Sequence, residues 1–327
     1  MPQRLELLNR WLTKTLGLPA YEIAPASSDA SFRRYFRIGF DGESRIVMDA
    51  PPDKEDSRPF VRIGKQLHAA GLNVPEILAE DLEQGFLLLS DLGTEQYLSA
   101  LNAETVDRLY GDAMGALAVL QTCGPDSDRL PPYDEALLRR EMELFREWYL
   151  GRHLGLDLGA KEQTVLEETF TLLAGSALEQ PQVGVHRDYH SRNLMVCTHN
   201  PGILDFQDAV HGPLTYDLVS LLRDCYIDWP REQVEQWAQD YHHIAADHGL
   251  LRGPQEEQFL RWFDLMGVQR HLKATGIFAR LNYRDNKPGY MNDIPRTLGY
   301  VAEVSGRYPE LRPFLQLLEE HVLPGLV

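Results

Sequence analysis

The segment that most constrains the fold of this chain is residues 186–193, which read HRDYHSRN. In this segment Asp188 is followed five residues later by Asn193, and a further acid, Asp205, lies downstream. Kinases use this spacing to place a base for the acceptor hydroxyl beside an amide and a carboxylate that hold magnesium. The sequence therefore predicts a phosphoryl-transfer site, with Asp188 as the base and Asn193 and Asp205 as the metal ligands.

Short apolar runs around this segment explain how the groups converge. Residues 183–186, 194–197 and 203–204 are predicted as short strands. The stretch 199–202 (HNPG) is typical of a turn, because Pro fixes φ and Gly allows positive φ, so the last two strands should pair as a hairpin. Such a hairpin places Asn193 beside Asp205. The alternative, that Asp188, Asn193 and Asp205 are ordinary caps and loop acids, is disfavoured by their combined spacing.

The residues before Gly93 have the pattern of a small β-rich unit. Residues 21–50 read as three strands broken at 27–31 and at Asp41-Gly42. Residues 57–70 are predicted as a helix, since Pro59 lies just inside its start and Gly71 follows its end. Strand-like runs at 76–80 and 86–90 complete a predicted five-stranded sheet with one helix.

Beyond Gly93 the apolar spacing becomes mostly helical. The predicted helices cover 103–122, 135–150, 161–178, 214–227, 232–249, 254–281, 293–306 and 310–321. At 327 residues the chain exceeds the length that one core usually supports, so we expect a nucleotide-binding lobe over 1–92, ending in a hinge, and a helical lobe over 93–327. The predicted fold class is α+β, a bilobal protein-kinase-like fold.

Charge and cysteine content limit the expected partners and location. The formal net charge of −17 repels phosphate backbones and anionic lipids, so neither nucleic acid nor a membrane surface is expected to bind. No apolar run approaches membrane-spanning length, and residues 1–16 lack the pattern of a signal peptide. The three cysteines offer no disulfide framework. We therefore expect a cytoplasmic protein without an obligate protein partner.

The loop and the two-part pattern resemble the aminoglycoside phosphotransferase family, which shares the Asp–Asn spacing and a metal-binding Asp in a context like Leu204-Asp205-Phe206. Within it, the chain resembles the bacterial anomeric kinases of N-acetylmuramate and N-acetylglucosamine in cell-wall recycling. This resemblance spans essentially the whole chain and is carried by 46–52 (IVMDAPP), 89–93 (LSDLG), 186–190 (HRDYH), 204–209 (LDFQDA) and 270–273 (RHLK). It implies an ATP- and Mg²⁺-dependent sugar kinase with a sugar 1-phosphate as product.

The resemblance also implies roles for residues around the loop. Backbone groups from Leu89 through Ser90 and Asp91 to Leu92 would form the hinge that binds adenine. Asp217 would tie down the catalytic loop beside His186, although a carboxylate at a helix N-terminus is an equal alternative. The implied substrate residues are His190, Arg192, Asp208, Arg270, His271, Lys273 and Arg280, with Tyr290 and Asp293 further on. A turn acid remains the alternative for Asp208, and a basic helix face for 270–280.

The chain departs from the kinase pattern where the nucleotide phosphates should bind. Residues 27–31 contain no glycine, which leaves as polar candidates Ser28, Asp29, Ser31, Arg33 and Arg34. Met48 stands in the register of the phosphate-binding Lys, and the predicted helix 57–70 has no acid to pair with one. Arg62, with Arg58 four residues earlier and Lys65 behind, is the candidate replacement. The alternative is a solvated basic face.

Other functions remain open at this point. Loss of the strand Lys is compatible with a catalytically weak pseudokinase-like binding module, but such modules usually lose the base or a metal ligand, and Asp188, Asn193 and Asp205 are all present. A protein–protein adaptor would expose a large apolar patch. Among enzymes, the alternative acceptors are an aminoglycoside, choline or homoserine. A cationic acceptor favours an acid-lined pocket, whereas Arg270, Lys273 and Arg280 favour a neutral or acidic one.

Overall fold

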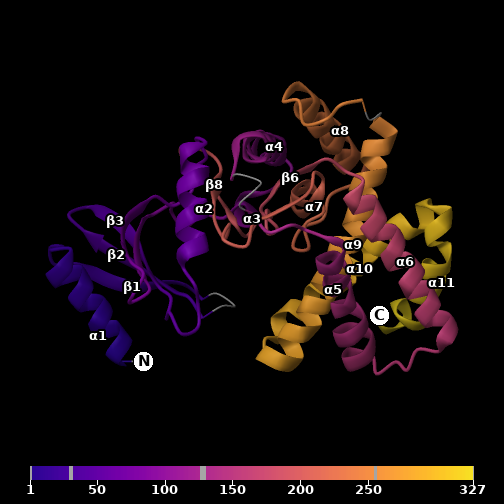
Figure 1. Cartoon of the computed structure of the whole chain (residues 1–327), viewed down its shortest axis with the longest axis horizontal. Coiled ribbons are helices and arrows are strands. Elements are labelled where there is room, and N and C mark those ends of the chain that lie inside the picture. Colours follow the sequence, from indigo (N-terminus) through magenta and orange to yellow (C-terminus); the bar gives the residue numbers. More distant parts are fainter. Residues whose placement is uncertain (1, 29–31, 126–129, 254–255, 327) are drawn as a thin grey trace.

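The computed structural model describes residues 2–28, 32–125, 130–253 and 256–326, and shows a sheet lobe beside a mainly helical lobe (Figure 1). The sheet lobe is a five-stranded antiparallel sheet in the order β1-β2-β3-β5-β4. Its elements are β1 (Glu22–Ser28), β2 (Arg34–Phe40), β3 (Glu43–Asp49), α2 (Arg58–Ala69), β4 (Ile77–Asp81) and β5 (Phe86–Ser90). The predicted fold class, the five strands and the helix are confirmed.

Alternate residues of the central strands supply two separate cores, as the period of two in a strand requires. Val47 belongs to the cluster formed with α1 (Pro2–Arg10) and the π-helical turn η1 (Trp11–Thr15), while the next residue, Met48, belongs to the main core with α2. Met48 is fully buried among apolar side chains. A charged Lys at this position would be desolvated without a partner, which explains why the sheet carries an apolar residue here.

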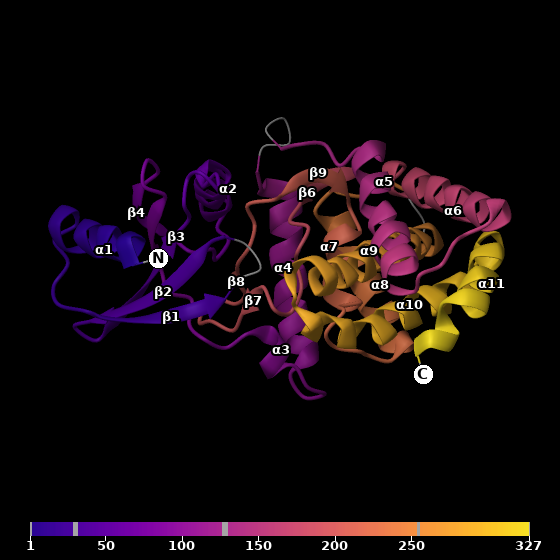
Figure 2. The same ribbon diagram turned by 90° about the horizontal axis from the view of Figure 1, so that it is seen from below.

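The helical lobe is built around one long buried helix, α9 (Glu256–Asp285), which packs against α5, α6, α7, α8 and α10 (Figure 2). The other helices are α3 (Tyr97–Ala100), α4 (Val106–Cys123), α5 (Glu135–Leu144), the π-helix η3 (Phe145–His153), α6 (Ala160–Leu178), α7 (Tyr216–Leu222), α8 (Arg231–Asp247), the 3₁₀ helix η4 (Pro288–Asp293), α10 (Ile294–Arg307) and α11 (Arg312–His321). All eight predicted helices are present; the one predicted over 214–227 ends early, at Leu222.

Four short strands carry the loop of the helical lobe. β7 (Leu194–Met195) pairs antiparallel with β8 (Gly202–Ile203), which confirms the predicted hairpin. β6 (Gln182–Val185) pairs with β9 (Val210–Pro213), and this last strand was not predicted, because Gly212 and Pro213 are poor strand formers.

A glycine lets α9 approach the end of α5. A Cβ atom on Gly276 would lie 2.3 Å from the carbonyl carbon of Leu144, far inside van der Waals contact. The helix predicted over 135–150 also changes from α to π geometry at Phe145, beside this crossing. The close approach brings α5 against the turn of α9 that precedes Gly276, and this turn carries Lys273.

Candidate active site

The catalytic loop begins at the end of β6 and is held there by a buried carboxylate. The backbone N–H groups of His186 and Arg187 donate to Asp217 on α7, at 2.6 and 2.9 Å. Arg187 has φ = 78°, a left-handed conformation that side-chain-bearing residues rarely adopt. Burial raises the pKa of Asp217 to about 6. The loop therefore enters the site in a fixed and unusual backbone conformation.

A second buried carboxylate, Asp224, holds the middle of the loop. Asp224 accepts hydrogen bonds from the backbone N–H of Ser191 at 3.0 Å and from its hydroxyl at 2.5 Å. The helix α7 ends before Asp224, so the acid can turn toward the loop and also accept from the N–H of Tyr226. The sequence did not identify this residue as functional. The available signal was an acid that closely follows the apolar run of this helix.

The structure brings Asp188, Asn193 and Asp205 to one place. The amide nitrogen of Asn193 donates to the backbone oxygen of Asp188 at 3.0 Å and to Asp205 Oδ2 at 3.4 Å. The hairpin fixes this arrangement, since the N–H of Leu204 donates to the carbonyl of Asn193 at 2.9 Å. Asp205 has φ = 64°, and Gln207 donates to its other carboxylate oxygen at 2.7 Å. The roles predicted for the three residues remain predictions.

Positive charges keep Asp188 ionised. Burial opposes ionisation, but the charges of Lys273 and Arg187 outweigh it and lower the pKa of Asp188. Lys273 Nζ donates to the hydroxyl of Tyr216 at 2.8 Å and lies 3.2 Å from Glu141 Oε1. Burial likewise opposes the charge of Lys273, and Glu141 is the main group that raises its pKa above the usual value.

Glu141 on α5 is the centre of this buried network. It forms an ion pair with Arg187 at 2.5 Å and accepts a hydrogen bond from the hydroxyl of Tyr133. Its side chain is 7% exposed, and the charges of Arg187 and Lys273 offset the cost of desolvating its carboxylate. The sequence alone did not identify Glu141 as functional. The signal was an acid on the apolar stripe of the helix, beside Leu138 and Met142.

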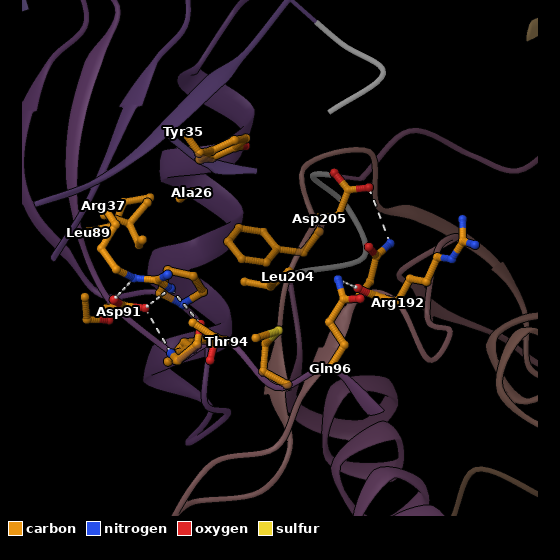
Figure 3. A pocket seen from close by; sticks show the side chains of 18 of the residues that line it. Ala26, Tyr35, Arg37, Leu89, Asp91, Thr94, Gln96, Arg192, Leu204 and Asp205 are labelled. Carbon is orange, nitrogen blue, oxygen red and sulfur yellow. Dashed lines mark hydrogen bonds and ion pairs between the residues drawn. The ribbon is translucent and has the colours of Figure 1, made fainter. Parts of the chain in front are cut away.

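Two cavities border the loop. The first lies between the sheet and the hairpin and has a volume of about 350 Å³ (Figure 3). All four predicted hinge residues line it, namely Leu89, Ser90, Asp91 and Leu92. Apolar side chains form much of the remaining wall: Ala26, Ile46, Phe60, Pro75, Met195, Leu204 and Phe206. An apolar cavity of this size beside a hinge suits a purine.

The hinge is clamped to the sheet by an ion pair that the sequence did not reveal. Arg37 on β2 donates to both carboxylate oxygens of Asp91, at 2.6 and 3.0 Å, and to the carbonyl of Gly93 at 2.8 Å. Although burial opposes it, hydrogen bonds from Arg37 and Ser44 lower the pKa of Asp91. The carboxylate of Asp91 is therefore engaged by hydrogen bonds within the protein. A ligand can contact only the backbone groups of this residue.

The second cavity, of about 260 Å³, lies on the helical side of the loop and is lined by Asp188. It collects four of the predicted substrate residues, His190, Arg192, Arg270 and Lys273, together with Tyr290. The remaining lining residues are Asn193, Asp205, Tyr216, Cys225, Tyr226, Ala274, Ile277, Phe278 and Leu281. Burial lowers the pKa of His190, and its Nδ1 has no hydrogen-bond partner among the described residues.

Three predicted substrate residues, and also Asp293, which pairs with Arg296, do not line this cavity. His271 lies on a neighbouring face of α9, where its Nε2 lies 2.8 Å from the carbonyl of Arg223; burial and the charge of Arg270 lower its pKa to about 3. Arg280 lies further along α9 and is half-buried outside the cavity, and Asp208 is exposed. A helix places every third or fourth residue on one face, so a run of adjacent polar residues cannot all reach one ligand.

The cations predicted to bind the nucleotide do not line the first cavity either. Arg58 is 78% exposed and pairs with Asp56, and Lys65 pairs with Glu80. Arg33 pairs with Glu55 at 3.3 Å, Arg34 with Asp49, and Arg62 is half-buried on α2. Ser28 ends β1, while Asp29 and Ser31 lie outside the described residues. None of these cations lines the first cavity, although, against the effect of burial, the charge of Asp205 helps to raise the pKa of Arg33.

Two adjoining cavities that share Arg192, Asn193 and Asp205 in their walls have the organisation of a phosphotransferase cleft. Residues 22–260 match the model of the phosphotransferase enzyme family, known as APH, and the chain belongs to this family. In the part of the chain that is described, no helix is long and apolar enough to cross a membrane.

Two curated relatives are similar to the chain over nearly their whole length. The N-acetylmuramate/N-acetylglucosamine kinase of Pseudomonas putida is 50% identical, over 97% of this chain and 96% of the relative. The protein of the same name from Pseudomonas aeruginosa is 49% identical, over 96% of each chain. Among solved structures, ADP-bound aminoglycoside phosphotransferase APH(2'')-Ib superimposes with a TM-score of 0.56 at 17% identity, covering 91% of this chain and 98% of that one.

Proposed function

We propose that this protein is an ATP-dependent kinase that phosphorylates N-acetylmuramate and N-acetylglucosamine at the anomeric hydroxyl. The observation that carries the kinase activity is that Arg192, Asn193 and Asp205 line both cavities. A phosphoryl group that moves from a nucleotide in the first cavity to an acceptor in the second passes these residues. The acceptor is supported by the relatives, which carry that activity in their names over almost the whole chain.

The chemistry follows from the position of Asp188 in the acceptor cavity. The sugar hydroxyl donates its hydrogen bond to Asp188, and this carboxylate receives the proton as the oxygen attacks the γ-phosphorus. The anomeric hydroxyl is more acidic than an ordinary alcohol, so positioning contributes more than basicity. The low pKa of Asp188 fits this division, because the carboxylate stays ionised and ready to accept a hydrogen bond.

The residues present fit a magnesium ion held jointly with the nucleotide. The amide nitrogen of Asn193 is engaged in hydrogen bonds, so its Oδ1 is the atom left for a cation, and Asp205 adds a carboxylate. Among the described residues no group of three or more His, Cys, Asp or Glu side chains could hold a metal alone. Magnesium is usually held by one or two protein ligands plus phosphate oxygens. When bound, the ion neutralises the developing charge on those oxygens.

The electrostatics of the acceptor cavity favour an acidic or neutral sugar over a cationic acceptor. Arg270 is 6% exposed, and among the described residues its guanidinium hydrogen-bonds only the thiol of Cys225, at 3.6 Å. A buried guanidinium that faces a cavity without a paired carboxylate is stabilised by an anionic ligand. The lactyl carboxylate of N-acetylmuramate is such a group, and Tyr226, Phe278 and Tyr290 supply apolar surface for the sugar ring.

Phosphorus NMR of the products tests the function directly. The protein is incubated with Mg²⁺-ATP and each of N-acetylmuramate, N-acetylglucosamine, choline, homoserine and an aminoglycoside. We expect sugar 1-phosphates from the two amino sugars. Turnover of an amino alcohol or aminoglycoside alone would overturn the acceptor assignment and leave the kinase assignment standing, whereas no turnover of any acceptor would overturn both.

Replacing Arg270 by Ala tests the carboxylate assignment. A charge-assisted hydrogen bond contributes about 1.5–3 kcal/mol, so the ratio of kcat/KM for N-acetylmuramate to that for N-acetylglucosamine should fall by roughly ten- to a hundredfold. Arg280→Ala is the matched control, because Arg280 lies on the same helix outside the cavity, and its ratio should not change. Equal losses on both sugars in Arg270→Ala would assign Arg270 to supporting the pocket.

A further inference from the structure

The structure leaves the transferring phosphoryl group without the cation that kinases usually supply from the third strand. Met48 occupies that position in the core. We propose that Arg192, on the catalytic loop itself, binds the equatorial oxygens of the γ-phosphoryl group during transfer and replaces the strand Lys. This inference rests on the proposed kinase activity but not on which acceptor the kinase uses.

Position singles out Arg192 among the cations that line the two cavities. It lines both cavities, together with the predicted metal ligands Asn193 and Asp205. Arg37 lines only the nucleotide cavity, and Arg270 and Lys273 line only the acceptor cavity. A group that stabilises charge on the phosphoryl group during transfer has to reach the space between donor and acceptor. Of these four cations, only Arg192 lines both the nucleotide cavity and the acceptor cavity.

The guanidinium of Arg192 is also available, whereas the positively charged groups of its neighbours Arg37 and Lys273 are engaged by carboxylates. Arg37 is held by Asp91, and Lys273 by Glu141. Within the described part of the chain, the Arg192 guanidinium makes neither a hydrogen bond nor an ion pair, and it stacks on the ring of Tyr226 with Cζ 3.6 Å from the ring centroid. Stacking on an aromatic face leaves the N–H groups at the edge of the guanidinium free to bind oxygen atoms in plane.

The backbone around Arg192 is fixed on both sides. Its carbonyl accepts a hydrogen bond from Gln96 at 2.8 Å, the preceding Ser191 is held by Asp224, and the following Asn193 is held by Asp188. In Figure 3 the side chain of Arg192 extends away from the hinge residues Leu89 and Asp91. The cation is therefore pre-organised beyond the nucleotide base, on the side where the acceptor cavity begins.

The step assigned to Arg192 conserves atoms and charge. The acceptor oxygen forms a bond to the γ-phosphorus while the bond from this phosphorus to the β–γ bridging oxygen breaks, and the electron pair leaves with ADP. The hydroxyl proton goes to Asp188. Negative charge is spread over three equatorial oxygens as these bonds change, and a bidentate guanidinium binds two such oxygens better in the transition state than in bound ATP.

Steady-state kinetics of Arg192→Ala and Arg192→Lys test the inference on whichever acceptor the wild-type protein phosphorylates. We expect kcat to fall at least about a hundredfold in Arg192→Ala, with KM for ATP and for the acceptor changed by less than about threefold, because the contact is made in the transition state. Arg192→Lys should recover part of kcat, since it restores the charge without the bidentate geometry. Binding of ADP, measured by calorimetry, should stay at the wild-type level.

Arg152→Ala is the matched control. Arg152 also lies over a tyrosine ring, that of Tyr283, but is exposed and lines neither cavity, so its kcat should equal that of the wild type. Three results would overturn the inference. They are an unchanged kcat with a raised KM for N-acetylmuramate alone, weakened ADP binding with unchanged kcat, and full activity of Arg192→Ala whatever the kcat of Arg33→Ala.

Discussion

Replacing Glu141 by Gln should destabilise the protein, and adding Lys273→Met should reverse part of the loss. The buried network contains two cations, Lys273 and Arg187, and two carboxylates, Glu141 and Asp188, so its formal charge is balanced. Glu141→Gln keeps the shape of the side chain but leaves two cations opposite one carboxylate. Lys273→Met alone leaves an excess of negative charge, and the double variant restores the balance.

The magnitude follows from the distance of 3.2 Å between Lys273 Nζ and Glu141 Oε1. At an effective dielectric constant of about 20, two unit charges at this separation attract by about 5 kcal/mol. Desolvation offsets part of this attraction, and removing one partner of a buried pair costs about 3–5 kcal/mol. Since a folded protein is stable by about 5–15 kcal/mol, Glu141→Gln should lower the urea midpoint clearly.

A double-mutant cycle measured by urea unfolding, followed by circular dichroism, isolates the interaction. The double variant should be more stable than the sum of the two single losses by about 0.5–3 kcal/mol. The matched control is Glu143→Gln on the same helix, whose carboxylate is 43% exposed and pairs with Arg146, and it should cost less than about 1 kcal/mol. Additivity within about 0.5 kcal/mol would refute the reasoning, because it would mean that the two charges do not interact.

Two further predictions concern the loop. Asp188→Asn and Asp205→Asn should each fold normally and lower kcat by at least about a hundredfold in an ADP-release assay, and near-normal turnover would remove that residue from its role. Burial raises the pKa of Asp217 to about 6, so the folded state binds this proton more tightly than the unfolded state and loses stability as pH rises from about 4 to about 6. The stability of the wild type relative to Asp217→Asn should therefore fall by up to about 3 kcal/mol between about pH 4 and pH 7, and a constant difference would place the titrating group elsewhere.

Features set by neighbouring residues were predictable, and features set by distant pairing were not. The hairpin that joins Asn193 to Asp205 follows from a turn and two adjacent apolar runs, so the sequence predicts it. The partner of Lys273 is 132 positions away, on a helix brought into contact by the close approach at Gly276. The sequence around either residue does not indicate that the two will pair. For the same reason the periodic pattern could not show which face of α9 meets the cavity.

The elements that the charged residues belong to also distinguish this site from that of a protein kinase. There, a Lys on the third strand pairs with a Glu on the helix of the small lobe, so the phosphate-binding cation belongs to the part of the fold that moves with the sheet. Here the buried Lys–Glu pair joins α9 to α5, and Arg192 belongs to the catalytic loop, so both lie in the helical lobe with the base. Rotation of the sheet relative to the helices would change the fit of the purine without making or breaking a charge contact at Asp188. Under the proposed mechanism the sheet contributes nucleotide binding, and the charges that lower the pKa of Asp188 all belong to the helical lobe.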